Sequence, residues 1–218
     1  GHLPRDQARD HVGGAARREG HHHAQGLAGK VVRCMRGRLR ERGAAVRCVL
    51  TEAGAKFVTP LSLQALSEDR VYIDMFSLTD ESEMGHIQLS RDADLLVVAP
   101  ATANILARMA GGLADDLAAT VLLATDKPVL VAPAMNVRMW THAATATNVE
   151  TLKARGVFFV GPNDGAMACN EHGPGRMSEP SEIVAVIESM LGAGRPPLAQ
   201  PMAGKRALVT SGPTREAI

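Results

Sequence analysis

Short runs of consecutive apolar residues alternate along the chain with segments of helical periodicity, and this alternation limits the possible folds more than any other feature. The runs cover residues 45–50, 94–99, 128–132, 157–160 and 206–210, with Arg47 as the one charged residue in the interior of a run. An uninterrupted apolar run of this length is typical of a strand buried on both faces, as in a parallel sheet. The sequence therefore predicts an α/β fold with a doubly wound, mostly parallel, Rossmann-like (flavodoxin-like) sheet.

The segments between the runs predict the helices of this fold. One long helix is predicted from apolar residues spaced three to four apart, namely Ile105, Leu106, Met109, Leu113, Leu117 and Val121. Pro100 is expected to end the strand before it, and Gly43 to end an earlier helix that begins near Val31. Ligands of doubly wound sheets bind beyond the carboxyl ends of the strands, so the residues that follow each run are the first candidates for a site.

Composition divides the chain into four parts. Residues 1–30 lack apolar periodicity and are predicted to be a disordered or non-native head, for example a frame-shifted translation. Residues 31–191 form the predicted α/β domain, and the Gly- and Pro-rich residues 192–204 form a linker. Residues 205–218 start a new strand and turn that cannot bury a core alone, and they are expected to be the truncated start of a further domain.

Charge and composition weigh against several classes of function. The formal net charge is +1, and the basic residues gather in residues 1–47, which hold 11 Lys and Arg against 4 Asp and Glu. A basic arm can bind nucleic acid, but only 3% of the residues are aromatic, which disfavours recognition by base stacking. No apolar run reaches the roughly 18–20 residues of a membrane span. We therefore expect neither a nucleic-acid nor a membrane partner.

Three widely spaced cysteines do not form a disulfide framework, so a reducing, cytoplasmic setting is expected. Cys34 and Cys48 lie on apolar faces and are predicted to be buried in the core. Cys169 lies in a Gly- and Pro-rich loop, residues 165–180, and is either an acid, base or nucleophile or an incidental surface thiol. Cys169 and His172 are too few ligands for zinc, and no metal site is predicted.

Two further segments hold polar residues at predicted strand ends. Asn136 lies in the segment P-A-M-N-V-R-M-W, where its amide either binds a carboxylate or amide or simply caps a packed turn. Residues 100–104 lie between a strand and a helix N-terminus, where free N–H groups favour an anion such as phosphate. His86 is a lone histidine, a type more often structural than catalytic. The chain has neither a G-x-G-x-x-G motif nor a Walker A loop.

Together these segments resemble one family, the homo-oligomeric flavin-containing cysteine decarboxylases. The motifs are H-I-Q-L-S with A-D-L-L-V-V-A-P-A-T-A-N, G-L-A-D-D-L, P-A-M-N-V-R-M-W, and A-C-N-E-H-G-P-G-R-M-S-E-P. The resemblance runs from about residue 31 to residue 218 and is strongest to the branch that acts in coenzyme A biosynthesis. The closing motif T-S-G-P-T-R-E is similar to the start of a phosphopantothenate–cysteine ligase domain.

The resemblance implies an FMN-dependent carboxy-lyase that converts 4′-phosphopantothenoylcysteine into 4′-phosphopantetheine. In this chemistry the cysteine unit passes a hydride to the flavin, the thioaldehyde product acts as electron sink for loss of carbon dioxide, and the hydride then returns. By correspondence, His86 assists substrate activation or decarboxylation, and Cys169 protonates the enethiolate. Asn136 binds the substrate carboxylate, with Met139 in the same motif.

The resemblance also implies the surroundings of the cofactor. FMN would lie against Thr51, Thr102 and Asn104 at the strand ends, in trimers that assemble further into dodecamers. Two features depart from the family pattern. Residues 1–30 hold no buried strand followed by the G-x-I-A-A-Y-K-type turn that binds the flavin phosphate, and Ile105 stands where the family usually has a hydroxyl residue.

Two alternative functions follow from these features. The departures leave open a flavin-poor structural or regulatory subunit of the same fold. The family also contains decarboxylases of peptide C-terminal cysteines, against which the T-S-G-P-T-R-E motif argues. Ligase activity is not expected from the residues present.

Overall fold

The computed structural model describes residues 34–35, 37–73, 85–166, 171–192 and 204–211. The predicted head, nearly all of the predicted linker and residues 212–218 lie outside this part of the chain. No helix in the described part is long and apolar enough to cross a membrane.

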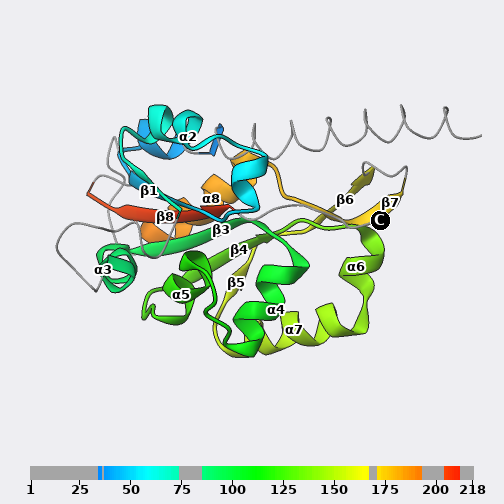
Figure 1. The fold of residues 1–218 in the computed structure, drawn as a ribbon. Helices are drawn as coiled ribbons and strands as arrows, with labels where there is room; N and C mark the ends of the chain where they lie inside the picture. Colours follow the sequence, from blue (N-terminus) through cyan, green and yellow to red (C-terminus); the bar gives the residue numbers. More distant parts are fainter. Residues whose placement is uncertain (1–33, 36, 74–84, 167–170, 193–203, 212–218) are drawn as a thin grey trace, which may run out of the picture.

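Six strands form one sheet in the order β2-β1-β8-β3-β4-β5, and each strand is parallel to its neighbours (Figure 1). The strands are β1 (Ala45–Leu50), β2 (Val71–Tyr72), β3 (Leu95–Ala101), β4 (Val129–Pro133), β5 (Phe158–Phe159) and β8 (Arg206–Ser211). All five predicted apolar runs form strands. The predicted α/β fold with a parallel sheet is confirmed.

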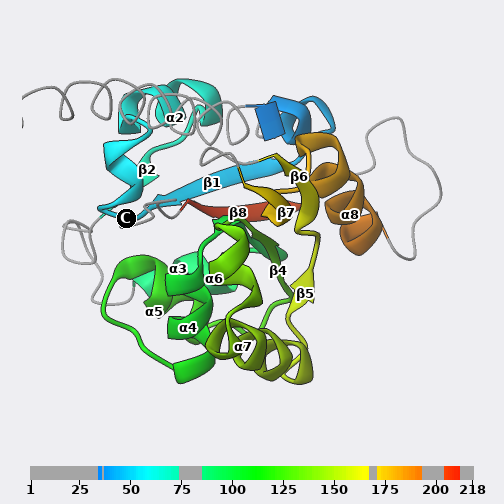
Figure 2. The same ribbon diagram turned by 90° about the vertical axis from the view of Figure 1, so that its right-hand side faces the viewer.

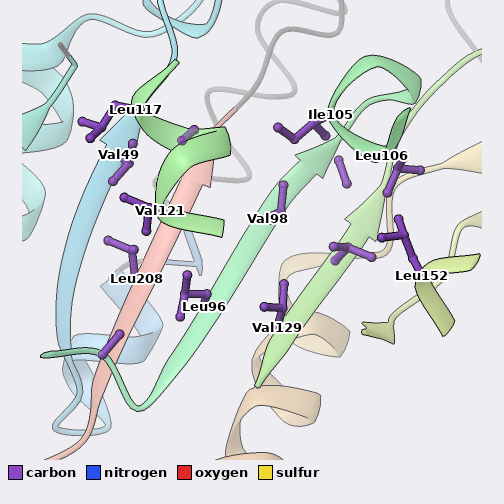
Figure 3. Close-up of a cluster of buried hydrophobic side chains, with 14 of the residues drawn as sticks. Val49, Leu96, Val98, Ile105, Leu106, Leu117, Val121, Val129, Leu152 and Leu208 are labelled. Carbon is purple, nitrogen blue, oxygen red and sulfur yellow. The ribbon is translucent and has the colours of Figure 1, made fainter. Parts of the chain in front are cut away.

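Helices cover both faces of this sheet, as Figure 2 shows with α2 and α8 on one side and α3, α4, α5 and α7 on the other. The second group is α3 (Gly85–Asp92), α4 (Ala103–Gly111), α5 (Leu117–Leu123) and α7 (Ala143–Ala154). Their apolar side chains pack on Leu96, Val98 and Leu208 of the sheet (Figure 3). The opposite face packs on α8 (Pro180–Gly192) and on helical residues within 34–41, while α2 (Pro60–Ser67) covers Leu50.

A short hairpin stands apart from the main sheet. Its strands β6 (Asn163–Ala166) and β7 (His172–Arg176) pair antiparallel, where the sequence analysis expected only a loop. The hairpin favours glycine at residue 173 for two reasons. A Cβ there would lie only 3.3 Å from Val137 Cγ2, which is too close for ordinary packing, and the φ of +150° is one that other residues rarely adopt. Gly175 accepts a hydrogen bond from the Met135 N–H at 3.0 Å, which fastens the hairpin to the end of β4.

The single long helix predicted from Ile105 to Val121 is wrong, because the structure has two helices there. Gly112 ends α4 in the left-handed region, at φ +69°, and its N–H donates to the carbonyls of Arg108 and Met109. Leu113 is consequently exposed, although the pattern places it on the buried face. Asp116 then begins α5 by accepting the Ala119 N–H at 2.7 Å. Both helices pack on the same face, so the apolar spacing continues across the break.

Two smaller expectations are also wrong. Pro100 does not end its strand, since β3 continues to Ala101. The pairing of β3 with β4 shifts register between Val98 and Ala101, and a proline is tolerated at such an irregularity because it has no amide hydrogen to pair. Cys34 is exposed, whereas Cys48 is buried as predicted. The predicted helix end at Gly43 is confirmed, with φ +85° and its N–H 2.8 Å from the Arg40 carbonyl oxygen.

The strand expected to open a further domain is the third strand of this sheet. β8 pairs with β1 along its whole length and with β3 from Ala207 to Thr210. Leu208 and Val209 are both buried, one in each of the two helical layers. Within the described residues, β8 therefore shares the core of the α/β domain. The likeness of residues 210–216 to the start of a ligase domain stays a prediction.

Candidate functional site

A pocket of about 490 Å³ opens at the carboxyl ends of β1, β8 and β3. The chain leaves β1 toward the face covered by α2 and leaves β3 toward the opposite face, covered by α4. Such a switch point in a doubly wound sheet is where ligands bind. The volume falls within the usual range for small-molecule and cofactor sites.

Two threonines at the pocket wall also fix the turns that follow their strands. The Oγ1 of Thr51 accepts the Gly54 N–H at 3.0 Å, in the short turn η1 (Gly54–Lys56). The Oγ1 of Thr102 caps α4 by accepting the Ile105 N–H at 3.4 Å. Asn104 and Ile105 lie in the first turn of α4 and line the same pocket. The first turn of a helix presents free N–H groups, which attract an anionic group.

Charged side chains that the sequence analysis did not single out form another part of the wall. Lys56 and Arg108 both line the pocket. The Nη1 of Arg108 lies 2.5 Å from Asp116 Oδ2 and 3.1 Å from Asp115 Oδ1. The motif G-L-A-D-D-L had no assigned role, and in the structure it pairs Arg108 and caps α5. Lys56 belongs to an irregular turn, where no periodic pattern identifies it.

Apolar side chains complete the pocket. Met135, at the end of β4, and Met139, on α6 (Val137–Thr141), line it together with Val98 and Ile105. Ile105 is buried and also packs into the main core. The pocket therefore combines hydroxyl groups and charges with an apolar surface that suits a flat ring.

Asn136 lies beside the pocket at the N-terminus of α6, where it makes two contacts. Its Oδ1 accepts the Arg138 N–H at 2.7 Å, and its Nδ2 donates to Glu171 Oε2. Glu171 Oε1 also lies 3.4 Å from Arg138 Nε. The amide thus caps a helix with its oxygen and binds a carboxylate with its nitrogen, so the two interpretations of Asn136 are compatible.

The structure brings together four of the seven predicted site residues. Thr51, Thr102, Asn104 and Met139 all line the pocket, and Asn136 is three residues from Met139. His86 is the second residue of α3, and the structure describes its backbone but not its side chain. Cys169 lies between β6 and β7, outside the described residues. The roles assigned to all seven residues stay predictions.

One atom in the pocket wall points to a polar ligand. Thr210 is 1% exposed, and its Oγ1 is a buried side-chain oxygen with no hydrogen-bond partner in the described part of the chain. Buried polar atoms in folded proteins almost always have a partner. Groups of three or more His, Cys, Asp and Glu side chains placed to hold a metal ion are absent from the same part of the chain.

A family model and curated relatives match most of this chain. A family model described as Flavoprotein matches residues 28–192. The coenzyme A biosynthesis bifunctional protein CoaBC of Vibrio vulnificus is 48% identical over 181 residues, which cover 83% of this chain and 44% of that protein. The protein of the same name from Bacillus subtilis is 43% identical over the same shares. The chain thus spans less than half the length of these curated relatives.

Solved structures extend the likeness to the fold. A PPC decarboxylase with a Cys-to-Ser substitution, complexed with pantothenoylaminoethenethiol, is 35% identical with a TM-score of 0.61. The match covers 73% of this chain and 91% of that one. The FMN binding protein AtHal3 is 34% identical with a TM-score of 0.63, over 77% of this chain and 95% of that one. The chain therefore belongs to the flavoprotein family, as a homologue of the phosphopantothenoylcysteine decarboxylase part of the CoaBC proteins.

Proposed function

We propose that this chain is an FMN-dependent decarboxylase that converts 4′-phosphopantothenoylcysteine into 4′-phosphopantetheine. The observation that carries the proposal is the convergence of Thr51, Thr102, Asn104 and Met139 on one pocket at the switch point of the sheet. The relatives named above support it, since they are coenzyme A biosynthesis proteins and a PPC decarboxylase. Ligase activity is not part of the proposal, because the chain matches only 44% of the bifunctional relative.

The pocket fits FMN through its mixture of surfaces. Thr51, Thr102 and the N–H groups at the start of α4 would hold polar groups of the cofactor, while Met135 and Met139 would cover apolar ring surface. When bound, FMN would take up a hydride from the substrate and return it, which side chains alone cannot do.

The remaining steps belong to side chains of this chain. Asn136 Nδ2 already binds the carboxylate of Glu171, and the substrate carboxylate would take its place there. His86 would assist the step that activates or decarboxylates the substrate. The thiol of Cys169 would donate a proton to the enethiolate that decarboxylation leaves.

The partners and setting are proposed with the activity. We expect a cytoplasmic homotrimer, or a homododecamer assembled from trimers, with FMN at the subunit contacts. Sedimentation velocity on the purified chain measures the assembly directly, and a monomer at micromolar concentration would contradict it.

A flavin-poor structural subunit is the second candidate. The observation in its favour is Ile105, which fills its place in the pocket with a buried aliphatic side chain instead of a hydroxyl. A decarboxylase of peptide C-terminal cysteines is a third, and solved structures of FMN-dependent cysteine decarboxylases, such as SpaF at 30% identity, resemble the chain. These candidates differ in cofactor content and in substrate.

One set of measurements tests the proposal. The purified chain should show flavin absorbance, release FMN on heating, and release carbon dioxide from 4′-phosphopantothenoylcysteine but not from peptides ending in cysteine. Asn136→Ala should lower kcat/KM about 10- to 100-fold, because a hydrogen bond to a charged group is lost. Asn148→Ala is the matched control, because Asn148 on α7 is half-buried, as Asn136 is.

Each candidate gives a different result in these measurements. A chain that retains no flavin absorbance after incubation with FMN and removal of the free cofactor supports the structural subunit. Turnover of the peptide but not of 4′-phosphopantothenoylcysteine supports the peptide decarboxylase. Wild-type turnover in Asn136→Ala would remove Asn136 from its assigned role while leaving the rest of the proposal in place.

A further inference from the structure

Thr210 lies at the centre of the sheet and outside the residues that the family model matches. It is the fifth residue of β8, whereas the family match ends at residue 192. Its register partners are Val49 on β1 and Val98 on β3. Thr210 lines the pocket together with Val98, so its side chain belongs to the wall of the site and not only to the core.

A threonine is an unexpected choice at this position. Both register partners are valines, and valine has the same shape as threonine without the hydroxyl. Burying an unpaired hydroxyl costs free energy that a methyl group would not. Thr210 is 1% exposed, and its Oγ1 lacks a hydrogen-bond partner among the residues that the structure describes. The hydroxyl therefore needs a partner that is not part of the described chain.

The surroundings of Thr210 indicate what that partner is. Thr51 and Thr102 place two more hydroxyl groups at the same pocket, from the loops that follow the strands on either side of β8. We propose that the Thr210 hydroxyl forms a hydrogen bond with FMN, so that β8 completes the cofactor site as well as the sheet. This inference rests on the function proposed above. It adds a cofactor-binding residue to those predicted from the sequence.

The role of the hydroxyl can be separated from the role of the strand by one isosteric substitution. Thr210→Val removes the oxygen and keeps the packing, so the ligand-free protein should unfold at an equal or higher temperature than the wild type. The same variant should bind FMN about tenfold more weakly, the effect of losing roughly one hydrogen bond. A threonine that serves only the fold would instead lower the unfolding temperature and leave FMN affinity unchanged.

The experiment uses the full chain, freed of flavin and titrated with FMN, with quenching of flavin fluorescence as the readout of affinity. Thermal unfolding of the flavin-free protein is measured alongside. Thr210→Ser, which keeps the hydroxyl, should restore most of the affinity. Thr145→Val is the matched control, since Thr145 is buried on α7 and is not part of the pocket wall.

The outcomes distinguish the inference from the proposed function. Wild-type protein that does not bind FMN overturns the proposed function. Wild-type protein that binds FMN, with Thr210→Val binding equally tightly, overturns the inference alone. A weaker affinity in Thr210→Val that Thr210→Ser does not recover also overturns it, because the oxygen is then not the group that binds.

Discussion

At the scale of single residues, Glu171 makes the most informative contact near the pocket. Its carboxylate accepts a hydrogen bond from Asn136 Nδ2 and pairs with Arg138. Under the proposed function, this is the position that the substrate carboxylate takes. Glu171 therefore competes with the substrate for the amide, and its charge opposes the approach of a second carboxylate.

Replacing Glu171 by glutamine should therefore strengthen substrate binding. We expect Glu171→Gln to lower KM for 4′-phosphopantothenoylcysteine about three- to tenfold, since the repulsion is removed and the contact with Asn136 weakens. Steady-state kinetics measure this, with Glu150→Gln on the exposed side of α7 as the control. A KM that rises would show instead that Glu171 holds Asn136 in its binding orientation.

The predicted residues at the pocket share one recognisable property. Thr51, Thr102 and Asn104 follow apolar runs, and the carboxyl ends of parallel strands are where ligands bind. Thr210 also ends an apolar run, but the strand order that places it over the pocket depends on pairing between residues more than a hundred positions apart. Local sequence patterns do not carry that information.

At the scale of elements, an ion pair fastens α3, the helix of His86, to the sheet. Arg47 Nη1 on β1 lies 2.9 Å from Asp92 Oδ2, and Gln88 Nε2 donates to Asp92 Oδ1 at 2.7 Å. The hydrogen bond from Arg47 holds the pKa of the Asp92 carboxyl below its ordinary value of 3.8. The charged carboxylate therefore stabilises the fold above that value, and the stabilisation is lost as pH falls below it.

Asp92→Asn should accordingly destabilise the protein in a pH-dependent way. At about pH 7 the variant should unfold at a lower urea concentration than the wild type. The gap should narrow as the pH is lowered below 3.8 and through the lower pKa of the wild-type carboxyl in the folded state. Asp126→Asn is the control, because Asp126 is exposed and its one ion pair within the described residues is with its neighbour Lys127. A gap of constant size across this range would contradict the assignment.

The elements that were predicted correctly are those with a strong local pattern. β3 and β4 are apolar along their length and β1 is apolar except at Arg47, and burial on both faces requires such a run. The break between α4 and α5 was missed because Leu113 and Leu117 continue the spacing across Gly112. The β6–β7 hairpin was missed because its strands are rich in glycine and include Pro174, and residues of this kind normally mark loops.

At the scale of the whole molecule, β8 joins two groups of strands that otherwise have no contact in the sheet. β1 and β2 lie on one side of it, and β3, β4 and β5 lie on the other. Removing β8 would uncover the inner edges of β1 and β3 and leave a gap between two incomplete cores. Stability of the domain therefore depends on a segment that the family model does not match.

Two truncated chains test this dependence. A chain that ends at residue 204 should lose its cooperative urea transition, whereas one that ends at residue 211 should keep it because β8 is intact. Circular dichroism during urea titration follows both. Equal midpoints for the chain ending at residue 204 and the full chain would show that β8 is dispensable for the fold.

The place of β8 in the sheet also has a consequence for biosynthesis. The ribosome makes the central strand after the other five strands of the sheet, so a nascent chain holds two unfinished sheet fragments with open inner edges. Open edges of this kind readily add strands from other chains. Until residues 206–211 emerge, we therefore expect the open edges to need protection, for example by a chaperone. Without it they can pair with strands of other chains and aggregate.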